Sequence, residues 1–202
     1  GQDVHLPASG TGIPVRIGNA AGASTVSFTL HYDIGLLDVT GAVSNLPGVT
    51  VTTDLLVEGQ IGIVVTGITG LTGATTELVH LTATVPATAI TRYGQSHVLD
   101  LRDVSINGGA VAVRDDDGLH VAAYLGDATG DGAYAADDAQ AILDAMSRKY
   151  TGFGAYALAD PVVVAGAYGN GRLSVFDARL IGNMVYGVAQ PYIPALPVLP
   201  AL

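Results

Sequence analysis

The amino-acid sequence predicts a mainly β protein, in which a β-sandwich is followed by a small α-helical domain. Two observations support this fold class. Between residue 3 and about residue 123, apolar and polar residues alternate with a period of two, and turn-forming Gly, Pro and Asn residues interrupt the alternation roughly every 8 to 12 residues. After residue 125, the apolar residues recur with the period of amphipathic helices instead.

The predicted strands are short and follow one another closely. The clearest is TVSFTLH at residues 25–31, where an apolar side chain occupies every second position and would face a core. Turns coincide with residues such as Gly48 and Gly94, and we expect no helix before residue 123. By the same alternation, further strands are expected near residues 15–17, 49–53, 61–65, 78–85, 98–106, 111–113 and 119–121.

Two helices are predicted in the second part of the chain. Residues 137–149 (DDAQAILDAMSRK) and 176–186 (FDARLIGNMVY) each gather apolar side chains on one helical face, and a glycine-containing loop precedes each of them. The two loop–helix segments, GDGAYAADDAQAIL and GNGRLSVFDARLI, look like a degenerate duplication with a period of about 39 residues. The predicted organisation is therefore a β-sandwich over residues 1–123, a helical domain over 124–189 and a tail over 190–202.

The tail is rich in proline. Its four prolines stand at three-residue spacing, which excludes a helix or a central strand, so an extended or polyproline II segment is expected. The tail is either a linker or, because its other residues are largely apolar, a segment that packs on this chain or on a neighbour.

Composition excludes several classes of function. With 49% hydrophobic and 13% charged residues, the chain can bury a core. A net charge of −10 would repel nucleic-acid phosphates and anionic membranes, so we expect no nucleic-acid partner. The absence of cysteine excludes disulfides and thiolate metal sites. No apolar run approaches the roughly 20 residues of a membrane span.

The sequence also gives no sign of an enzyme. The five histidines are scattered over predicted strands without a metal-binding or catalytic spacing. No serine lies in a G-x-S-x-G motif, and no phosphate-binding glycine loop with its lysine is present. The acidic run at residues 115–117 precedes Gly118, where aspartates commonly form a turn. We therefore expect a binding function and no catalysis.

The strongest functional motif is DATGDGAYAADD at residues 127–138. A calcium loop of the EF-hand type takes oxygen ligands from its first, third, fifth, seventh, ninth and twelfth places and turns at a glycine in its sixth. Gly132 occupies the sixth place, and Ala135, in the ninth, would act through water. Ca²⁺ is a hard cation that prefers such oxygen ligands. The remaining places hold the candidate ligands Asp127, Thr129, Asp131, the carbonyl of Ala133, and Asp138.

A second, weaker copy of the loop spans residues 166–177 (GAYGNGRLSVFD). Its first and third places carry no carboxylate, and Asp160 could contribute only from an enlarged loop. We expect this copy to bind calcium weakly or not at all. Its candidate ligands are Asn170, the carbonyl of Arg172, and Asp177.

Both parts of the chain resemble known families. The pattern GDATGDG, the aspartate that opens the following helix and the second copy resemble the dockerin module over residues 125–188. Two departures from the EF-hand pattern, Thr129 in the third place and Asp138 instead of Glu in the twelfth, agree with this relative. The segments TVSFTLHYDIGLLDVTGAV, EGQIGIVVTG, LVHLTATVPA and DDDGLHV resemble, in order and spacing, a cohesin, a jelly-roll β-sandwich, over residues 3–123.

These resemblances imply calcium-dependent attachment to another protein, outside the cell or at its surface. The partner would be a cohesin or a dockerin, including another copy of this chain in a head-to-tail assembly, because a heterologous contact propagates unless it closes. In dockerins, the contact residues lie at the loop-to-helix junctions and on the helices. The corresponding residues here are Ala136, Asp137, Val175, Phe176, Leu180 and Met184.

An alternative function is a carbohydrate-binding β-sandwich that a dockerin attaches to a scaffold protein. Sugar-binding surfaces usually present exposed aromatic rings. The predicted β-sandwich has no Trp, and its aromatic residues are Phe28, Tyr32 and Tyr93. The sequence therefore favours protein attachment over carbohydrate binding.

Overall fold

The structure, a computed structural model of the chain, describes residues 2–3, 12–72, 74–124, 126–149, 174–190, 193 and 196. The chain forms two compact units. We call the first the β unit; it comprises Gly1–Val4, Thr11–Pro86 and Val98–Gly118. The second, the helical unit, comprises His5–Gly10, Ala87–His97 and Leu119–Leu202. Residues 87–97, which the sequence places among the strands of the β-sandwich, thus group with the helices.

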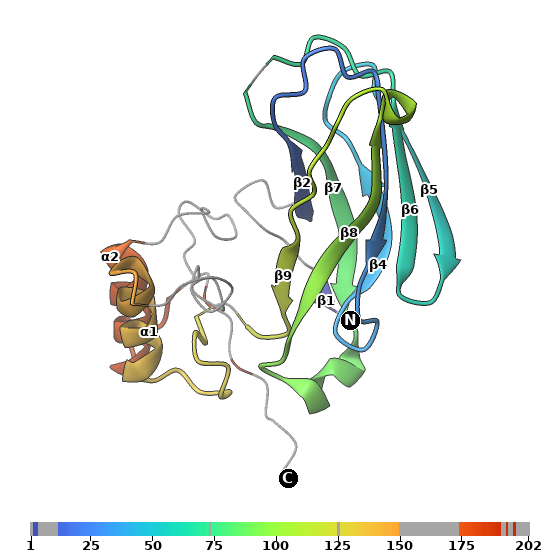
Figure 1. The fold of residues 1–202 in the computed structure, drawn as a ribbon. Coiled ribbons are helices and arrows are strands. Elements are labelled where there is room, and N and C mark those ends of the chain that lie inside the picture. The colour runs from blue at the N-terminus through green and yellow to red at the C-terminus, as the bar shows by residue number, and fades with distance from the viewer. Residues whose placement is uncertain are drawn as a thin grey trace. The chain divides into compact units, whose positions relative to one another are not determined.

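The strands form two antiparallel sheets, as the alternating pattern predicts (Figure 1). In the four-stranded sheet, β7 pairs with β1, β2 and β4. The five-stranded sheet has the order β5-β6-β3-β8-β9. The strands are β1 (Gln2–Asp3), β2 (Ile13–Ile17), β3 (Thr25–His31), β4 (Asp38–Val43), β5 (Thr50–Val57), β6 (Gln60–Thr66), β7 (Thr76–Val85), β8 (Ser96–Ile106) and β9 (Gly118–Val121).

The core of the β unit follows directly from the alternation. In β3, Val26, Phe28 and Leu30 are buried, whereas Ser27 and Thr29 lie on the other face. The apolar residues of β6 and β7 complete this core, which is the predicted sandwich interior. Its fully buried members include Leu37, Val39, Ile61, Ile63, Val65, Val79 and Leu81.

Three short segments of the β unit and its neighbourhood differ from the prediction. The expectation of no helix before residue 123 is wrong, because Ala87–Arg92 (η1) and Asn107–Gly109 (η2) form 3-10 helices. In η2, the Asn107 side chain accepts hydrogen bonds from the backbone N–H groups of Ser24 and Thr25 at 2.8 and 3.1 Å. The strand expected at residues 111–113 is reduced to one bridge between Ile106 and Val111, because those valines find no core and stay exposed.

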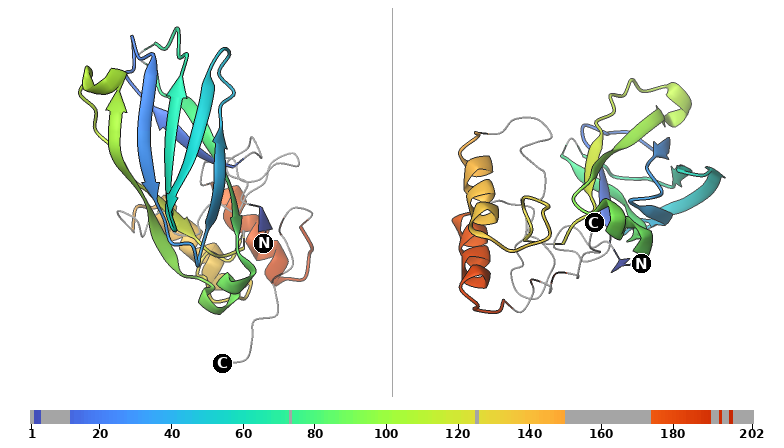
Figure 2. Two further views of the ribbon diagram at one scale, coloured as in Figure 1. Left: turned by 90° about the vertical axis from the view of Figure 1, so that its right-hand side faces the viewer. Right: turned by 90° about the horizontal axis from the view of Figure 1, so that it is seen from below.

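The two predicted helices are confirmed, with ends shifted by a few residues. They are α1 (Ala136–Met146) and α2 (Val175–Val185), which pack together (Figure 2). Ile142 and Ile181 are fully buried between them. Ile193 is buried in the same cluster, so at least this residue of the apolar tail packs on the helices. None of the helices in the described part of the chain has the length and apolar character that crossing a membrane requires.

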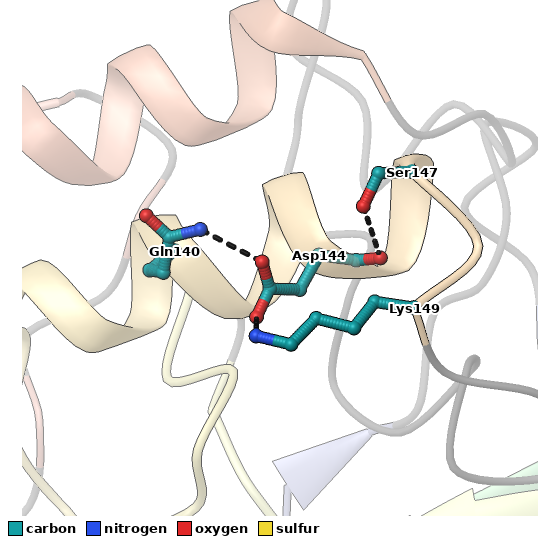
Figure 3. Close-up of polar contacts among 4 residues, drawn as sticks. All are labelled: Gln140, Asp144, Ser147 and Lys149. Atoms are coloured by element: carbon teal, nitrogen blue, oxygen red, sulfur yellow. Dashed lines mark hydrogen bonds and ion pairs between the residues drawn. The ribbon is translucent and has the colours of Figure 1, made fainter.

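A polar network explains why α1 ends earlier than predicted (Figure 3). Asp144 is buried, and its carboxylate accepts a hydrogen bond from Gln140 at 2.8 Å and forms an ion pair with Lys149. Ser147 donates to the backbone carbonyl of Asp144 at 3.0 Å. The chain therefore folds back after Met146, with Arg148 at a positive φ of 59°. Residues 147–149, which were predicted to be helical, thus lie beyond the C-terminal end of α1 and contact it through Asp144.

Candidate functional site

Asp127 organises the first predicted calcium loop. Its side chain is fully buried. Its Oδ1 atom accepts hydrogen bonds from the backbone N–H groups of Gly130 and Asp131 at 2.7 and 3.2 Å, and Oδ2 accepts one from Gly132 at 2.8 Å. Gly130 and Gly132 adopt positive φ angles of 73° and 85°, which glycine reaches without strain. The backbone therefore curls around a single carboxylate, as a cation-binding loop requires.

Asp138 connects the loop to the start of α1. It is fully buried and stands at the third position of the helix. Its Oδ2 atom accepts from the N–H of Ala135 at 2.8 Å, and Oδ1 accepts from the N–H and the hydroxyl of Thr129 at 2.9 and 3.0 Å. A negative charge is also favourable at a helix N-terminus. Thr129 and Asp138, the predicted ligands at the third and twelfth places of the loop, are thus hydrogen-bonded to each other.

The electrostatics of the loop favour a bound cation. Burial raises the pKa of Asp138, the hydrogen bonds from Ala135 and Thr129 oppose that rise, and the charge of Asp127 adds to it. The pKa of the Tyr134 hydroxyl is raised by burial and then by both carboxylates. Within the described residues, neither aspartate has an ion pair with Lys, Arg or His. Two buried like charges without a cationic partner are costly, and a divalent cation would offset them.

The residues present therefore fit calcium in charge and in donor chemistry, because every candidate ligand is an oxygen. The fit is incomplete at the fifth place, where the exposed Asp131 side chain accepts from the N–H of Ala133 at 2.9 Å. Over the ranges that the structure describes, no three His, Cys, Asp or Glu side chains gather into a metal-holding cluster. Calcium binding by this loop remains a prediction.

The second loop is represented in the described residues by Asp177. Its predicted co-ligands Asn170 and Arg172, and also Asp160, lie outside those residues. Asp177 is fully buried at the start of α2, where Oδ2 accepts from the N–H and the hydroxyl of Ser174 at 2.6 and 2.5 Å. Among the residues that the structure describes, its buried Oδ1 atom has no hydrogen-bond partner. A carboxylate oxygen in this position carries a cost that a cation or another donor would relieve.

Two contacts near the first loop were not predicted. The hydroxyl of Tyr93 donates a hydrogen bond to Asp127 Oδ2 at 2.8 Å. His97 Nε2 lies 3.0 Å from His120 Nδ1, although the sequence indicated no paired histidines. Burial, and secondarily His97, lowers the pKa of His120 to about 4. Both contacts join residues more than twenty positions apart, so no local sequence pattern reveals them.

The predicted interface residues divide into two groups. Ala136 and Asp137 are exposed at the start of α1. Val175 and Phe176, at the same positions of α2, are 64% and 45% exposed. The last two predicted contact residues, Leu180 and Met184, pack instead against the helical core.

A cationic side chain accompanies the exposed residues of α2. The guanidinium carbon of Arg179 lies 5.0 Å from the centre of the Phe176 ring, within the range of a cation–π contact. Arg179 itself is exposed. We call Val175, Phe176 and Arg179 the α2 corner.

The outer face of the five-stranded sheet carries a shallow groove of about 320 Å³. Its floor is low because Gly62 of β6, which stands opposite Thr29 of β3 and Asp54 of β5, has no side chain. Asp103 of β8 has a positive φ of 51° where the β3–β8 register shifts, so a bulge forms there. The groove is lined by Ser27, Phe28, Thr29, Thr52, Asp54, Leu56, Gly62, Ile63, Val64 and Asp103.

The aromatic residues of the predicted sandwich do not form a sugar-binding platform. Phe28 is 4% exposed in the core. Tyr32 is half-buried, and its hydroxyl donates to the Val39 carbonyl at 3.4 Å. Tyr93 is half-buried and bonded to Asp127. None of these three rings is exposed.

Comparisons with known proteins give weak structural likenesses. Neither a protein-family model nor a curated protein matches the sequence. A non-cellulosomal cohesin from the hyperthermophilic archaeon Archaeoglobus fulgidus is 22% identical, with a TM-score of 0.45 over 59% of this chain and 79% of that chain. A cohesin module from a Clostridium perfringens family 33 glycoside hydrolase is 13% identical, with a TM-score of 0.42 over 60% and 95%.

A third likeness is to a chain of a type I cohesin–dockerin complex from Clostridium thermocellum, which is 11% identical, with a TM-score of 0.37 over 48% of this chain and 73% of that chain. At these identities and TM-scores, the likenesses do not assign the chain to a family. The function proposed below therefore rests on the residues of the chain itself.

Proposed function

We propose that the chain is an extracellular attachment module in which the sheet groove of one copy binds the α2 corner of another. Calcium in the loop at residues 127–138 would hold the helices in the binding conformation. Extracellular fluids supply calcium in the concentration range that weakly binding extracellular modules use. The alternative of carbohydrate binding has no exposed aromatic ring to support it among Phe28, Tyr32 and Tyr93.

The complementarity of the two surfaces carries this proposal. The groove offers apolar contact along Leu56 and Val64, which are 48% and 43% exposed, with the carboxylates of Asp54 and Asp103 in its lining. The α2 corner offers two exposed apolar side chains beside one guanidinium. Aromatic and arginine side chains are the residues that most often anchor protein interfaces. Opposite charges across such a contact add specificity and accelerate association.

The two surfaces differ from one another, so a contact between copies is heterologous. Such contacts generate rings when the rotation closes and open filaments when it does not. Among its described residues, each chain carries this groove on the five-stranded sheet and one apolar corner of this kind. We therefore propose a linear, head-to-tail arrangement.

The role proposed for calcium is structural. When bound, the ion would supply positive charge between the buried carboxylates of the loop. Asp138 holds the first turn of α1 through Ala135 and Thr129, and Ile142 of α1 packs against Ile181 of α2. Loss of the ion would leave the buried charges unpaired and weaken this packing, and with it the α2 corner.

Light scattering on the full chain tests the proposal. In calcium, the mean molar mass should rise with protein concentration, and a chelator should return it to the mass of one chain. Arg179→Glu should lower the mass in calcium, because it places a negative charge opposite Asp54 and Asp103. Arg114→Glu is a matched control, since Arg114 is exposed and lies outside both surfaces. A monodisperse monomer at high concentration in calcium would refute self-attachment.

A further inference from the structure

The segment that precedes β8 contacts the calcium loop directly. The Tyr93 hydroxyl donates to Asp127 Oδ2 at 2.8 Å and accepts a hydrogen bond from the N–H of Tyr124 at 3.0 Å. The hydroxyl is therefore fixed from both sides, with its proton directed at the carboxylate. The rings of Tyr93 and Tyr124 are stacked with their centres 6.2 Å apart, which fixes the side chain further.

Backbone contacts fix the same segment. The N–H of Gly94 donates to the Ala122 carbonyl at 3.1 Å, and the N–H of Ala122 donates to the Gln95 carbonyl at 3.0 Å. Gly94 has a positive φ of 78°, and a Cβ atom added there would lie 2.4 Å from the carbonyl oxygen of Gly130. The segment thus lies against the backbone of the loop, and only glycine permits that approach.

These contacts all lie within the helical unit, to which residues Ala87–His97 belong. An EF-hand loop is normally held by a helix that enters it. Here β9 and the described residues between it and the loop, 122–124 and 126, include no helix. The first predicted ligand, Asp127, is held by backbone N–H groups of the loop itself and, from outside the loop, by the Tyr93 hydroxyl.

We propose that Tyr93 is a positioning residue for the calcium loop and that it takes the part of the missing entering helix. This inference rests on the proposed calcium binding. Asp127 already uses Oδ1 for two backbone N–H groups and Oδ2 for the Gly132 N–H. The Tyr93 hydrogen bond adds a side-chain donor to this buried carboxylate and holds it from outside the loop. Partners of this kind, one shell outside a metal, typically change its affinity by about 10- to 100-fold.

The test is calorimetric titration of calcium into the full chain carrying Tyr93→Phe. This change removes one oxygen and keeps the stacked ring. The calcium dissociation constant should rise about tenfold. Circular dichroism in chelator should show unchanged secondary structure, which separates positioning from folding. Tyr32→Phe is the matched control, because its hydroxyl bonds only weakly to Val39 in the β unit, and it should leave the dissociation constant unchanged.

The outcomes separate this inference from the proposed function. If Tyr93→Phe binds calcium as tightly as the unaltered chain while Asp127→Asn loses binding, the positioning role is wrong and the calcium site stands. If the unaltered chain binds no calcium, both fail. If Tyr93→Phe and Tyr32→Phe weaken binding equally, the effect is not specific to the loop, and the positioning role is again wrong.

Discussion

Truncation of Phe176 gives the sharpest test of the attachment surface. Full burial of a phenylalanine side chain stabilises by up to about 3 kcal/mol relative to exposure. Phe176 is 45% exposed within the chain, so a partner that covers it gains roughly 45% of that value, about 1.3 kcal/mol. Because about 1.4 kcal/mol corresponds to a factor of ten, Phe176→Ala should weaken association between copies about tenfold.

Stability must be separated from association in this experiment. Phe176 lies outside the helical core cluster and is only partly covered within the chain, so its truncation should lower the free energy of unfolding by less than about 2 kcal/mol. Ile181→Ala, at a fully buried position, should instead cost about 2 to 5 kcal/mol. Thermal unfolding in calcium distinguishes the two variants. A Phe176→Ala chain as unstable as Ile181→Ala would show that Phe176 serves the core.

A mixing experiment then tests the head-to-tail geometry. Gly62→Lys blocks the groove, and a Cβ atom at Gly62 meets nothing closer than 3.7 Å, so the strand tolerates it. This variant keeps an intact α2 corner, whereas a Phe176→Ala, Arg179→Glu double variant keeps an intact groove. Each should be monomeric alone, and an equimolar mixture should form dimers and nothing larger, measured by sedimentation velocity. Filaments from either variant alone would refute the assignment of the two surfaces.

Three further predictions concern charge in the helical unit. Burial raises the pKa of Asp138 in the folded chain, so in chelator its ionisation destabilises the fold. Thermal stability should therefore fall as the pH rises from the ordinary aspartate pKa of 3.8 through the folded pKa, and Asp138→Asn should remove that dependence. In the folded chain, the pKa of His120 is lowered from 6.5 to about 4. The free energy of unfolding should therefore be at its full value above pH 6.5 and decline by roughly 3 kcal/mol toward pH 4. His120→Leu should abolish this decline. In a calorimetric titration, the Asp177→Asn chain should still bind one calcium ion tightly, because the first loop holds the better ligand set. Loss of all calcium binding would contradict the prediction that the first loop has the higher affinity.

The sequence predicts those parts of the molecule whose determinants are local. Alternation along β3 identifies Val26, Phe28 and Leu30 as core residues, and the structure buries all three. Likewise, most hydrogen bonds of the first loop join residues within a twelve-residue stretch, such as Thr129 to Asp138 and Gly130 to Asp127. Spacing alone therefore identifies the loop. A sequence pattern is sufficient to predict contacts between residues that lie close together in the sequence.

Contacts that depend on how strands and loops meet could not be predicted in this way. Tyr93 reaches Asp127 across 34 positions, and His97 meets His120 across 23. Both contacts depend on how β8 and the segment before it are aligned with β9 and the segment after it. The alternation of apolar and polar residues along the chain does not fix this alignment. The 3-10 helix η1 could not be predicted for a different reason, because its residues carry no helical periodicity.

The two loop–helix copies differ where they would meet a partner, and this difference follows from capping. In α2, Ser174 and the buried Asp177 fix the first turn, so the two residues between them point away from the core; these are Val175 and Phe176. In α1, the same two positions hold Ala136 and Asp137. Capping exposes both pairs, but only in α2 are both residues of the pair large and apolar. Only the second loop–helix copy therefore forms a hydrophobic corner. In the proposed assembly, this corner and the sheet groove would each hold one neighbouring copy, as a linear arrangement requires.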